Sequence, residues 1–158
     1  MATEIERKFL VQSDDWRRQV TERKHMVQAY FAGSDKASIR VRISGESANI
    51  NIKSATLDVQ RKEYEFPIPV DDARELVAEL CEQPVIEKTR YYVPHAGHMW
   101  EVDVFNGANE GLIVAEIELN DADEAFDKPS WLGVEVSHDK RYYNVCLVQN
   151  PYKNWSSD

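Results

Sequence analysis

The sequence predicts a mainly β fold of the α+β kind: an eight-stranded antiparallel β-barrel that encloses a tunnel, with flanking helices. Three observations predict it. Eight short segments alternate apolar and polar residues with the two-residue period of strands. Short turn sequences connect several of these segments as hairpins, which favours an antiparallel sheet that closes on itself. The polar residues of most segments are charged, and their signs are sorted from strand to strand.

Short connections rich in turn-forming residues separate the expected strands. Ser44-Gly45-Glu46-Ser47 joins the third strand to the fourth, and His95-Ala96-Gly97-His98 joins the sixth to the seventh. Asn106-Gly107-Ala108-Asn109 joins the seventh to the eighth. Glycine and asparagine favour the tight turns of hairpins. The expected strands lie near residues 3–11, 26–33, 37–44, 48–54, 59–69, 85–93, 98–105 and 111–119.

Three short amphipathic helices are expected to flank the sheet. In the first, Asp72 and Glu75 have the spacing of a capping box, and the following apolar residues recur with helical spacing. Pro129 closes the second helix, because proline cannot continue the hydrogen-bond ladder. The expected helices lie at residues 72–81, 121–129 and 139–147, with one further turn near 14–18.

Length and composition limit the function classes. A chain of 158 residues fits one domain, taken as residues 1–158. The net charge of −9 argues against nucleic-acid binding. No apolar run approaches the ~18 residues of a membrane span, and charged residues follow Met1 too closely for a signal peptide. We therefore expect a cytoplasmic protein with no membrane partner, and leave open whether it forms a homodimer.

The charged faces of the strands allow two arrangements. They can point outward to water around an apolar barrel interior, as is usual for a single strand. Alternatively, they can point inward and line a wet tunnel, since a barrel of about eight strands can enclose one small ligand. The charged sets are Glu4/Glu6/Lys8, Arg40/Arg42, Lys53, Arg61/Glu63/Glu65, Lys88/Arg90, Glu101/Asp103 and Glu116/Glu118.

Three points favour the tunnel. Amphipathic helices need an apolar partner, and the outer wall of such a barrel supplies one. The third and sixth strands carry only basic residues on their polar faces and the last two only acidic ones, whereas a solvated surface normally mixes signs. Paired carboxylates also recur on one strand face, where like charges about 7 Å apart repel each other unless a cation lies between them.

The residue types indicate the ligands of such a tunnel. Carboxylates without histidine or cysteine favour hard cations, Mg²⁺ or Mn²⁺. Lysine and arginine favour phosphate oxygens, and several of them together suit a polyanion such as a triphosphate. Carboxylates and bases in one cavity indicate metal-assisted phosphoryl transfer. The expected phosphate-binding residues are Lys8, Arg40, Arg42, Lys53, Arg61, Lys88 and Arg90.

These residues resemble the signature of a known family, the CYTH superfamily of triphosphate tunnel metalloenzymes. The Glu-x-Glu-x-Lys start at residues 4–8 is its hallmark, and the likeness continues in order along nearly the whole chain. The later matches are Ile39–Arg42, Ile52–Ser54, Arg61–Glu65, Glu87–Tyr91, Trp100–Phe105, Ala115–Leu119 and Asp139–Asn144. The short members that this chain resembles most are bacterial inorganic tripolyphosphatases.

The resemblance also implies roles for individual residues. Tyr30 matches a catalytic tyrosine that lies beside a tunnel lysine, and Lys53 is the expected partner. The family context of this tyrosine is usually Gln-Gly-Tyr, whereas here it is Gln28-Ala29-Tyr30, and a purely structural role for Tyr30 stays open. The implied metal ligands are Glu4, Glu6 and Glu118, with Glu63, Glu65 and Glu116 as further candidates.

Several alternatives remain open at this level. Glu101 and Asp103 either belong to the tunnel chemistry or form ion pairs that orient nearby bases. Lys140 and Arg141 either close one tunnel mouth or face solvent. The leading function is metal-dependent hydrolysis of inorganic tripolyphosphate. The same tunnel would support a class IV adenylyl cyclase, a thiamine or nucleoside triphosphatase, or a polyphosphate-binding module without catalysis.

Overall fold

The computed structural model describes residues 3–155, and within that range the chain forms nine β-strands and two α-helices. The strands are β1 (Thr3–Val11), β2 (Glu22–Tyr30), β3 (Ala37–Ser44), β4 (Ser47–Ser54), β5 (Gln60–Ile68), β6 (Ile86–His95), β7 (His98–Phe105), β8 (Ile113–Glu118) and β9 (Leu132–Glu135). The helices are α1 (Val70–Glu79) and α2 (Asn144–Gln149), with short 3₁₀ turns η1 (Asp15–Gln19), η2 (Gly107–Asn109), η3 (Lys140–Tyr142) and η4 (Tyr152–Asn154).

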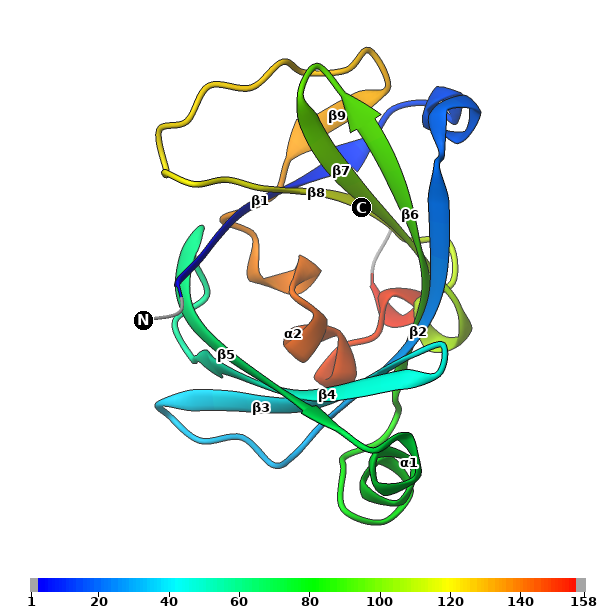
Figure 1. The fold of residues 1–158 in the computed structure, drawn as a ribbon, viewed down its shortest axis with the longest axis vertical. Helices are drawn as coiled ribbons and strands as arrows, with labels where there is room; N and C mark the ends of the chain where they lie inside the picture. The colour runs from blue at the N-terminus through cyan, green and yellow to red at the C-terminus, as the bar shows by residue number, and fades with distance from the viewer. Residues whose placement is uncertain (1–2, 156–158) are drawn as a thin grey trace.

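The sheet closes into a barrel. Its strand order is β5-β4-β3-β2-β6-β7-β8-β1-β9, and β5 also pairs with β1 through Thr3↔Lys62, Glu4↔Arg61 and Ile5↔Gln60. Strands β1 to β8 therefore form a closed antiparallel ring, seen end-on in Figure 1, which confirms the expected eight-stranded barrel. β9 pairs with β1 beyond the β5 contact, and the sequence analysis did not predict it.

The charged faces of the strands point inward, and most apolar faces point outward beneath covering segments. α1 packs Ala73 and its neighbours on the outside of β3 and β4, around Val41. On the opposite wall, Phe9 and Trp100 lie in a cluster with Phe126 of the 119–131 connection. The expectation that helices cover the outer wall is confirmed for α1, because the outer faces of β3 and β4 offer this helix apolar surface.

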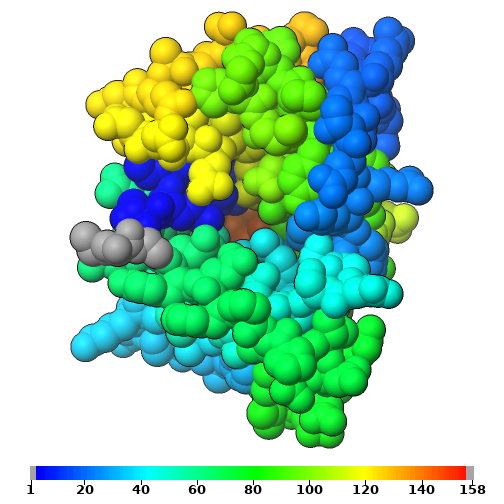
Figure 2. Space-filling model, in the orientation of Figure 1, coloured from blue at the N-terminus to red at the C-terminus, as the bar shows by residue number. Residues whose placement is uncertain are grey.

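One end of the barrel interior is apolar and is filled by α2. Inward positions switch there from charged to apolar, from Lys88 to Ile86 on β6 and from Glu116 to Val114 on β8. Leu147 of α2 packs against these residues. In Figure 1 α2 lies inside the ring of strands, and in Figure 2 a hollow opens toward the viewer with this segment at its floor. The third helix thus plugs the barrel instead of flanking it.

The predicted helix at 121–129 is wrong, because this segment is an irregular connection. The Asp121 side chain accepts a hydrogen bond from the Asp123 amide at 2.8 Å, which competes with helical bonding. The Glu124 carboxylate reaches back to the Asn120 amide at 2.7 Å, and Phe126 then packs on the outer wall. Side-chain hydrogen bonds and burial of the aromatic ring outweigh the weak helical periodicity.

Other boundaries also differ from the expected ones. α1 begins at Val70 after an extended Pro69, so Asp72 and Glu75 both lie inside the helix and form no capping box. β2 begins at Glu22 rather than at residue 26. The turn expected near 14–18 is present as η1, which buries Trp16. No helix among the described residues is long and apolar enough to cross a membrane.

Candidate functional site

The barrel encloses a cavity of about 310 Å³. Every residue that the sequence analysis proposed for the site lines it: Glu4, Glu6, Lys8, Tyr30, Arg40, Arg42, Lys53, Arg61, Glu63, Glu65, Lys88, Arg90, Glu116 and Glu118. Over the described residues the wall holds eight basic and seven acidic side chains. The strands place them there because the inward positions of a barrel strand recur every second residue.

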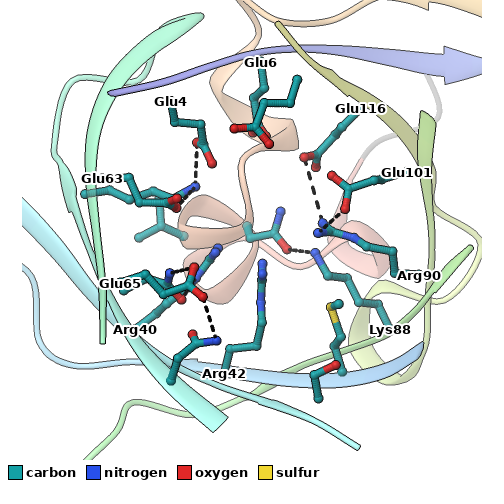
Figure 3. A pocket seen from close by; sticks show the side chains of 18 of the residues that line it. Glu4, Glu6, Arg40, Arg42, Glu63, Glu65, Lys88, Arg90, Glu101 and Glu116 are labelled. Atoms are coloured by element: carbon teal, nitrogen blue, oxygen red, sulfur yellow. Dashed lines mark hydrogen bonds and ion pairs between the residues drawn. The ribbon is translucent and has the colours of Figure 1, made fainter. Parts of the chain in front are cut away.

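Acidic and basic groups occupy different parts of the wall. Figure 3 shows Glu4, Glu6 and Glu116 on one side of the cavity and Arg40 and Arg42 on the other. The acidic side comes from β1 and β8, which pair through Glu6↔Glu118 and Lys8↔Glu116. The strand register therefore gathers carboxylates at one site of the wall and leaves guanidinium groups facing them.

Lys8 is a buried base whose positive charge is paired with two carboxylates. Its ammonium nitrogen lies 3.0 Å from Glu6 and 3.0 Å from Glu116. Burial lowers the pKa of Lys8, but the two carboxylates outweigh burial and the net shift is upward. The ammonium also lies 4.9 Å from the centre of the Tyr143 ring. Lys8 thus stays protonated at the boundary between the acidic wall and α2.

Lys53 joins the acidic wall from the other side. Its ammonium lies 2.8 Å from Glu4 and 3.4 Å from Glu63, and so bridges β4 to β1 and β5 near the barrel seam. Tyr30 is a direct cross-strand neighbour of Arg40. Among the hydrogen bonds of the described residues, the Lys53 ammonium is paired with Glu4 rather than with Tyr30. The two proposed catalytic residues share the cavity without touching each other.

Glu65 is held by amide groups. Asn49 donates to one carboxylate oxygen at 3.3 Å, and Asn51 donates to the other at 3.0 Å. The Asn51 oxygen in turn accepts from the Arg40 guanidinium at 3.2 Å. Glu65 therefore positions Arg40 through Asn51. The available sequence signal for this link was the spacing of Asn49 and Asn51, which places both on the inward face of β4.

The acidic wall carries more negative charge than its lysines neutralise. Burial and neighbouring Glu116 raise the pKa of Glu6. Burial, followed by Glu4 and Glu101, raises the pKa of Glu118. Crowded carboxylate oxygens of this kind suit a hard divalent cation, which would relieve the repulsion. The residues present fit such an ion.

The cation would have to displace ammonium groups. Residues 3–155 contain no set of three or more His, Cys, Asp or Glu side chains already gathered at metal-ligand spacing. Lys53 holds Glu4, while Lys8 holds Glu6 and Glu116. A cation at these carboxylates would therefore replace the ammonium groups of Lys8 and Lys53 as their partner.

Arg90 and Lys88 share a buried acid. Asp103 lies behind the cavity wall and accepts from Arg90 at 2.8 and 2.9 Å, with Lys88 at 2.7 Å. Glu101 lines the cavity and accepts from Arg90 at 3.0 Å. Both acids therefore form ion pairs with tunnel bases, one of the two alternatives that the sequence left open. Burial, with Arg90 and Arg42 close by, outweighs Asp103 and lowers the pKa of Lys88 to about 7.

Arg42 is partly buried and lies beside amide and cationic groups instead of a carboxylate. Its guanidinium donates to Gln28 at 2.6 Å, and the ion pairs of the described residues do not include it. Burial and the nearby Arg40 and Arg90 lower the pKa of Arg42 to about 10. Removing a cation from water without a carboxylate partner is costly even when the burial is partial, so this part of the wall favours an anion.

The sequence analysis missed the residues that close the tunnel floor. Tyr143, Asn144 and Val145 line the cavity at the start of α2, whereas Lys140 and Arg141 do not. Arg141 instead faces solvent and pairs with Asp139 at 2.6 Å. The switch of inward positions from charged to apolar on β6 and β8 was the available signal that a segment fills this end.

Comparisons with known proteins agree with this site. A family model described as the CYTH domain matches residues 2–144. A protein of Acetivibrio thermocellus named inorganic triphosphatase is 45% identical over 155 residues, which cover 98% of this chain and 99% of that protein. A Nitrosomonas europaea protein of the same name is 38% identical over 153 residues, covering 92% and 97%.

The fold comparison gives the same result. A solved structure described as an inorganic triphosphatase aligns with a TM-score of 0.65 at 36% identity, covering 92% of this chain and 97% of that one. The family match spans the strands that build the charged tunnel and the residues at its floor. The resemblance in the sequence is confirmed, and this chain belongs to the CYTH domain family.

Proposed function

We propose that this chain hydrolyses a triphosphate in its tunnel, that inorganic tripolyphosphate is the substrate, and that Mg²⁺ or Mn²⁺ is required. The observation that carries the proposal is the partly buried guanidinium of Arg42, which has no carboxylate partner within the described residues and faces a carboxylate-rich wall. Phosphate oxygens are the natural partners of such a guanidinium. The two relatives named inorganic triphosphatase support the same activity.

The basic wall would bind and orient the phosphate chain. Arg40 and Arg42 lie next to each other on one strand face, and Lys88 and Arg90 lie on another. Asp103 and Gln28 hold three of these groups in place before any ligand arrives. Positive groups that are already oriented stabilise charge on transferring and leaving phosphates without reorganising.

The acidic wall would hold the cation. We assign Glu4, Glu6 and Glu118 as ligands, with Glu63, Glu65 and Glu116 as further candidates. A divalent cation supplies neutralisation of phosphoryl oxygens and lowers the pKa of water. Among the candidates Glu65 is the weakest, because Asn49 and Asn51 already occupy its oxygens.

Tyr30 and Lys53 are assigned to catalysis from β2 and β4, which both pair with β3. Tyr30 lies beside Arg40, so its hydroxyl would donate to a phosphate that Arg40 binds. The Lys53 ammonium lies between Glu4 and Glu63, where it would offset charge on a phosphate close to the cation.

An inorganic chain suits the wall better than a nucleotide. The lining is charged or polar apart from Met26, Val145 and three tyrosines. An adenine ring would need apolar or stacking surface over most of its area. The cavity of about 310 Å³ also lies at the lower end of the range of roughly 300–1,000 Å³ for ligand pockets.

A substrate panel tests the proposal. Phosphate release would be measured from tripolyphosphate, ATP, thiamine triphosphate and pyrophosphate, each with Mg²⁺, with Mn²⁺ and with chelator. We expect the highest kcat/KM with tripolyphosphate and no release in chelator. Cyclic AMP formed from ATP would instead show a cyclase. Tight binding of tripolyphosphate with no release from any triphosphate would show a binding module.

A further inference from the structure

Asn144 joins two tunnel cations at the floor of the cavity. Its side-chain oxygen accepts from the Lys88 ammonium at 2.9 Å and from the Gln28 amide nitrogen at 3.1 Å. The Gln28 oxygen accepts from the Arg42 guanidinium at 2.6 Å. One buried carbonyl oxygen therefore positions Lys88 directly and Arg42 through Gln28.

This arrangement fixes the direction of the Asn144 amide. Lys88 can only donate, so the atom facing it must be the oxygen. The amide nitrogen then lies on the other side of the side-chain carbon, away from Lys88 and Gln28. Among the described residues no hydrogen bond engages this nitrogen, and Asn144 lines the cavity. It is a neutral donor next to a cluster of bases.

We propose that Asn144 is a substrate-binding residue whose side-chain nitrogen donates to a phosphate oxygen at the closed end of the tunnel while its oxygen positions Lys88 against the same phosphate. This inference rests on the proposed function of the tunnel. Because α2 closes this end, the contacted phosphate is a terminal one.

The chemistry of the position favours an amide. A carboxylate would satisfy Lys88 but repel the phosphate, and an ammonium would bind the phosphate but repel Lys88. A side-chain amide accepts from a cation on one side and donates to an anion on the other. The N–H bond to a charged oxygen is of the stronger, charge-assisted kind.

Asn144 also bears on the protonation of Lys88. The charged groups around Lys88 are Asp103 on β7, Arg90 on β6, Arg42 on β3 and Glu116 on β8. Within this set, the Asn144 oxygen favours the protonated ammonium by accepting its hydrogen bond. A carboxylate in place of this amide should raise the pKa of Lys88. Removal of the acceptor should lower it.

Two substitutions at this position test the proposal. Asn144→Asp keeps an oxygen for Lys88 and Gln28 but removes the donor and adds a negative charge at the cavity. We expect KM for tripolyphosphate to rise at least about tenfold, the size of one charge-assisted hydrogen bond, and the basic limb of kcat/KM to move to higher pH. Asn144→Ala removes both contacts. The basic limb of its kcat/KM against pH should move to lower pH.

Controls separate this role from a structural one. Asn150→Asp makes the same charge change just beyond the other end of α2, where the residue is exposed, and should leave KM unchanged. Should Asn144→Ala not fold, Asn144→Asp, which has the same shape, still gives a result. An unchanged KM in folded Asn144→Asp would overturn the proposal. So would basic limbs of kcat/KM that move in the same direction in the two variants.

The outcome is also distinguishable from failure of the proposed function. Wild-type protein that releases no phosphate from tripolyphosphate would remove the hydrolase assignment alone. Calorimetric titration with tripolyphosphate would then test Asn144 by affinity, with weaker binding to Asn144→Asp expected. Active wild-type protein with unaffected Asn144 variants would remove the inference alone.

Discussion

At the scale of single residues, two bases of the tunnel are in opposite electrostatic states. Lys8 contacts two carboxylates, whereas Arg42 contacts an amide and lies near other cations. Burying an uncompensated charge lowers stability, so selection for stability alone does not explain Arg42. Groups whose pKa burial and neighbours shift strongly often mark functional sites.

Arg42→Met should separate binding from stability. We expect KM for tripolyphosphate to rise about ten- to a hundredfold, since a lost charge-assisted bond contributes roughly 1.5–3 kcal/mol. The melting temperature should stay equal or increase, because the substitution removes a partly buried charge that has no carboxylate partner. Arg23→Met, at an exposed position of β2, should change neither quantity. A fall in stability with KM unchanged would assign Arg42 a structural role.

Lys88 should make substrate binding depend on pH. Its pKa of about 7 in the free protein lies below the ordinary value of 10.5, and a bound polyanion favours the protonated form. Binding should therefore take up a proton above pH 7, and affinity should fall as pH rises. Calorimetry in two buffers of different ionisation enthalpy measures this uptake at pH 6 and pH 8.

Lys88→Arg provides the comparison for that experiment, because a guanidinium stays protonated over this range. The variant should show less proton uptake at pH 8 than the wild-type protein, and the two should agree at pH 6. Titration of the tripolyphosphate itself is common to both proteins and cancels in the difference. Equal uptake at pH 8 would mean that Lys88 does not titrate on binding.

At the scale of elements, β9 and α2 complete the barrel in ways that alternation does not reveal. The amide of Lys8 donates to the Ser137 hydroxyl at 2.9 Å, and the Tyr143 hydroxyl donates to the Ser137 carbonyl at 2.9 Å. Arg7 points away from the tunnel and pairs with Glu135 at 2.6 Å. The segment after β9 therefore ties the floor of the tunnel to β1.

Gly133 allows the close approach of β9 to β1. A methyl group there would lie 3.0 Å from the carbonyl oxygen of Leu10. Gly133→Ala should reduce the free energy of unfolding by about 1–3 kcal/mol, as expected for overpacking against backbone. Gly33→Ala, with no atom within 4 Å of the added carbon, is the matched control. Equal denaturant midpoints for the two variants would contradict the close approach.

At the scale of the whole molecule, the barrel holds many carboxylates close together in a chain of net charge −9. The seam between β1 and β5 consists of three paired positions, and Lys53 with Glu4 bridges β4 to β1 beside it. Repulsion within the acidic wall opposes closure of the ring. A bound cation should therefore stabilise the entire fold.

Mg²⁺ should raise the melting temperature relative to chelator, because a ligand that binds only the folded state stabilises it. Glu118→Gln should reduce this response by removing an expected ligand, while Glu75→Gln on the exposed face of α1 should retain it. Differential scanning fluorimetry over a Mg²⁺ series measures the shift. A response of Glu118→Gln equal to that of the wild-type protein would exclude Glu118 as a ligand.

The alternation of charged and apolar residues predicted the strands, and the sorting of charge between strands favoured a tunnel lined by the charged faces. Glu4, Glu6 and Lys8 recur at the period of a strand, and in a closed barrel this period alone decides which side chains share the interior. The prediction of a helix at 121–129 was wrong because a few side-chain hydrogen bonds and the burial of Phe126 determine the conformation of that segment. β9 was not predicted because it is only four residues long and contains Gly133, so it shows no clear alternation.

The sequence by itself determined the strand faces, the sorting of charge and the charged strand residues that line the cavity, because these follow from a local period. Only the tertiary structure decided which charges neutralise one another. It paired Lys8 and Lys53 with the acidic wall, left Arg42 without an acid, and placed Asn144 against Lys88. These contacts join residues far apart in the chain, and electrostatic energies depend on distances and burial that no local pattern contains.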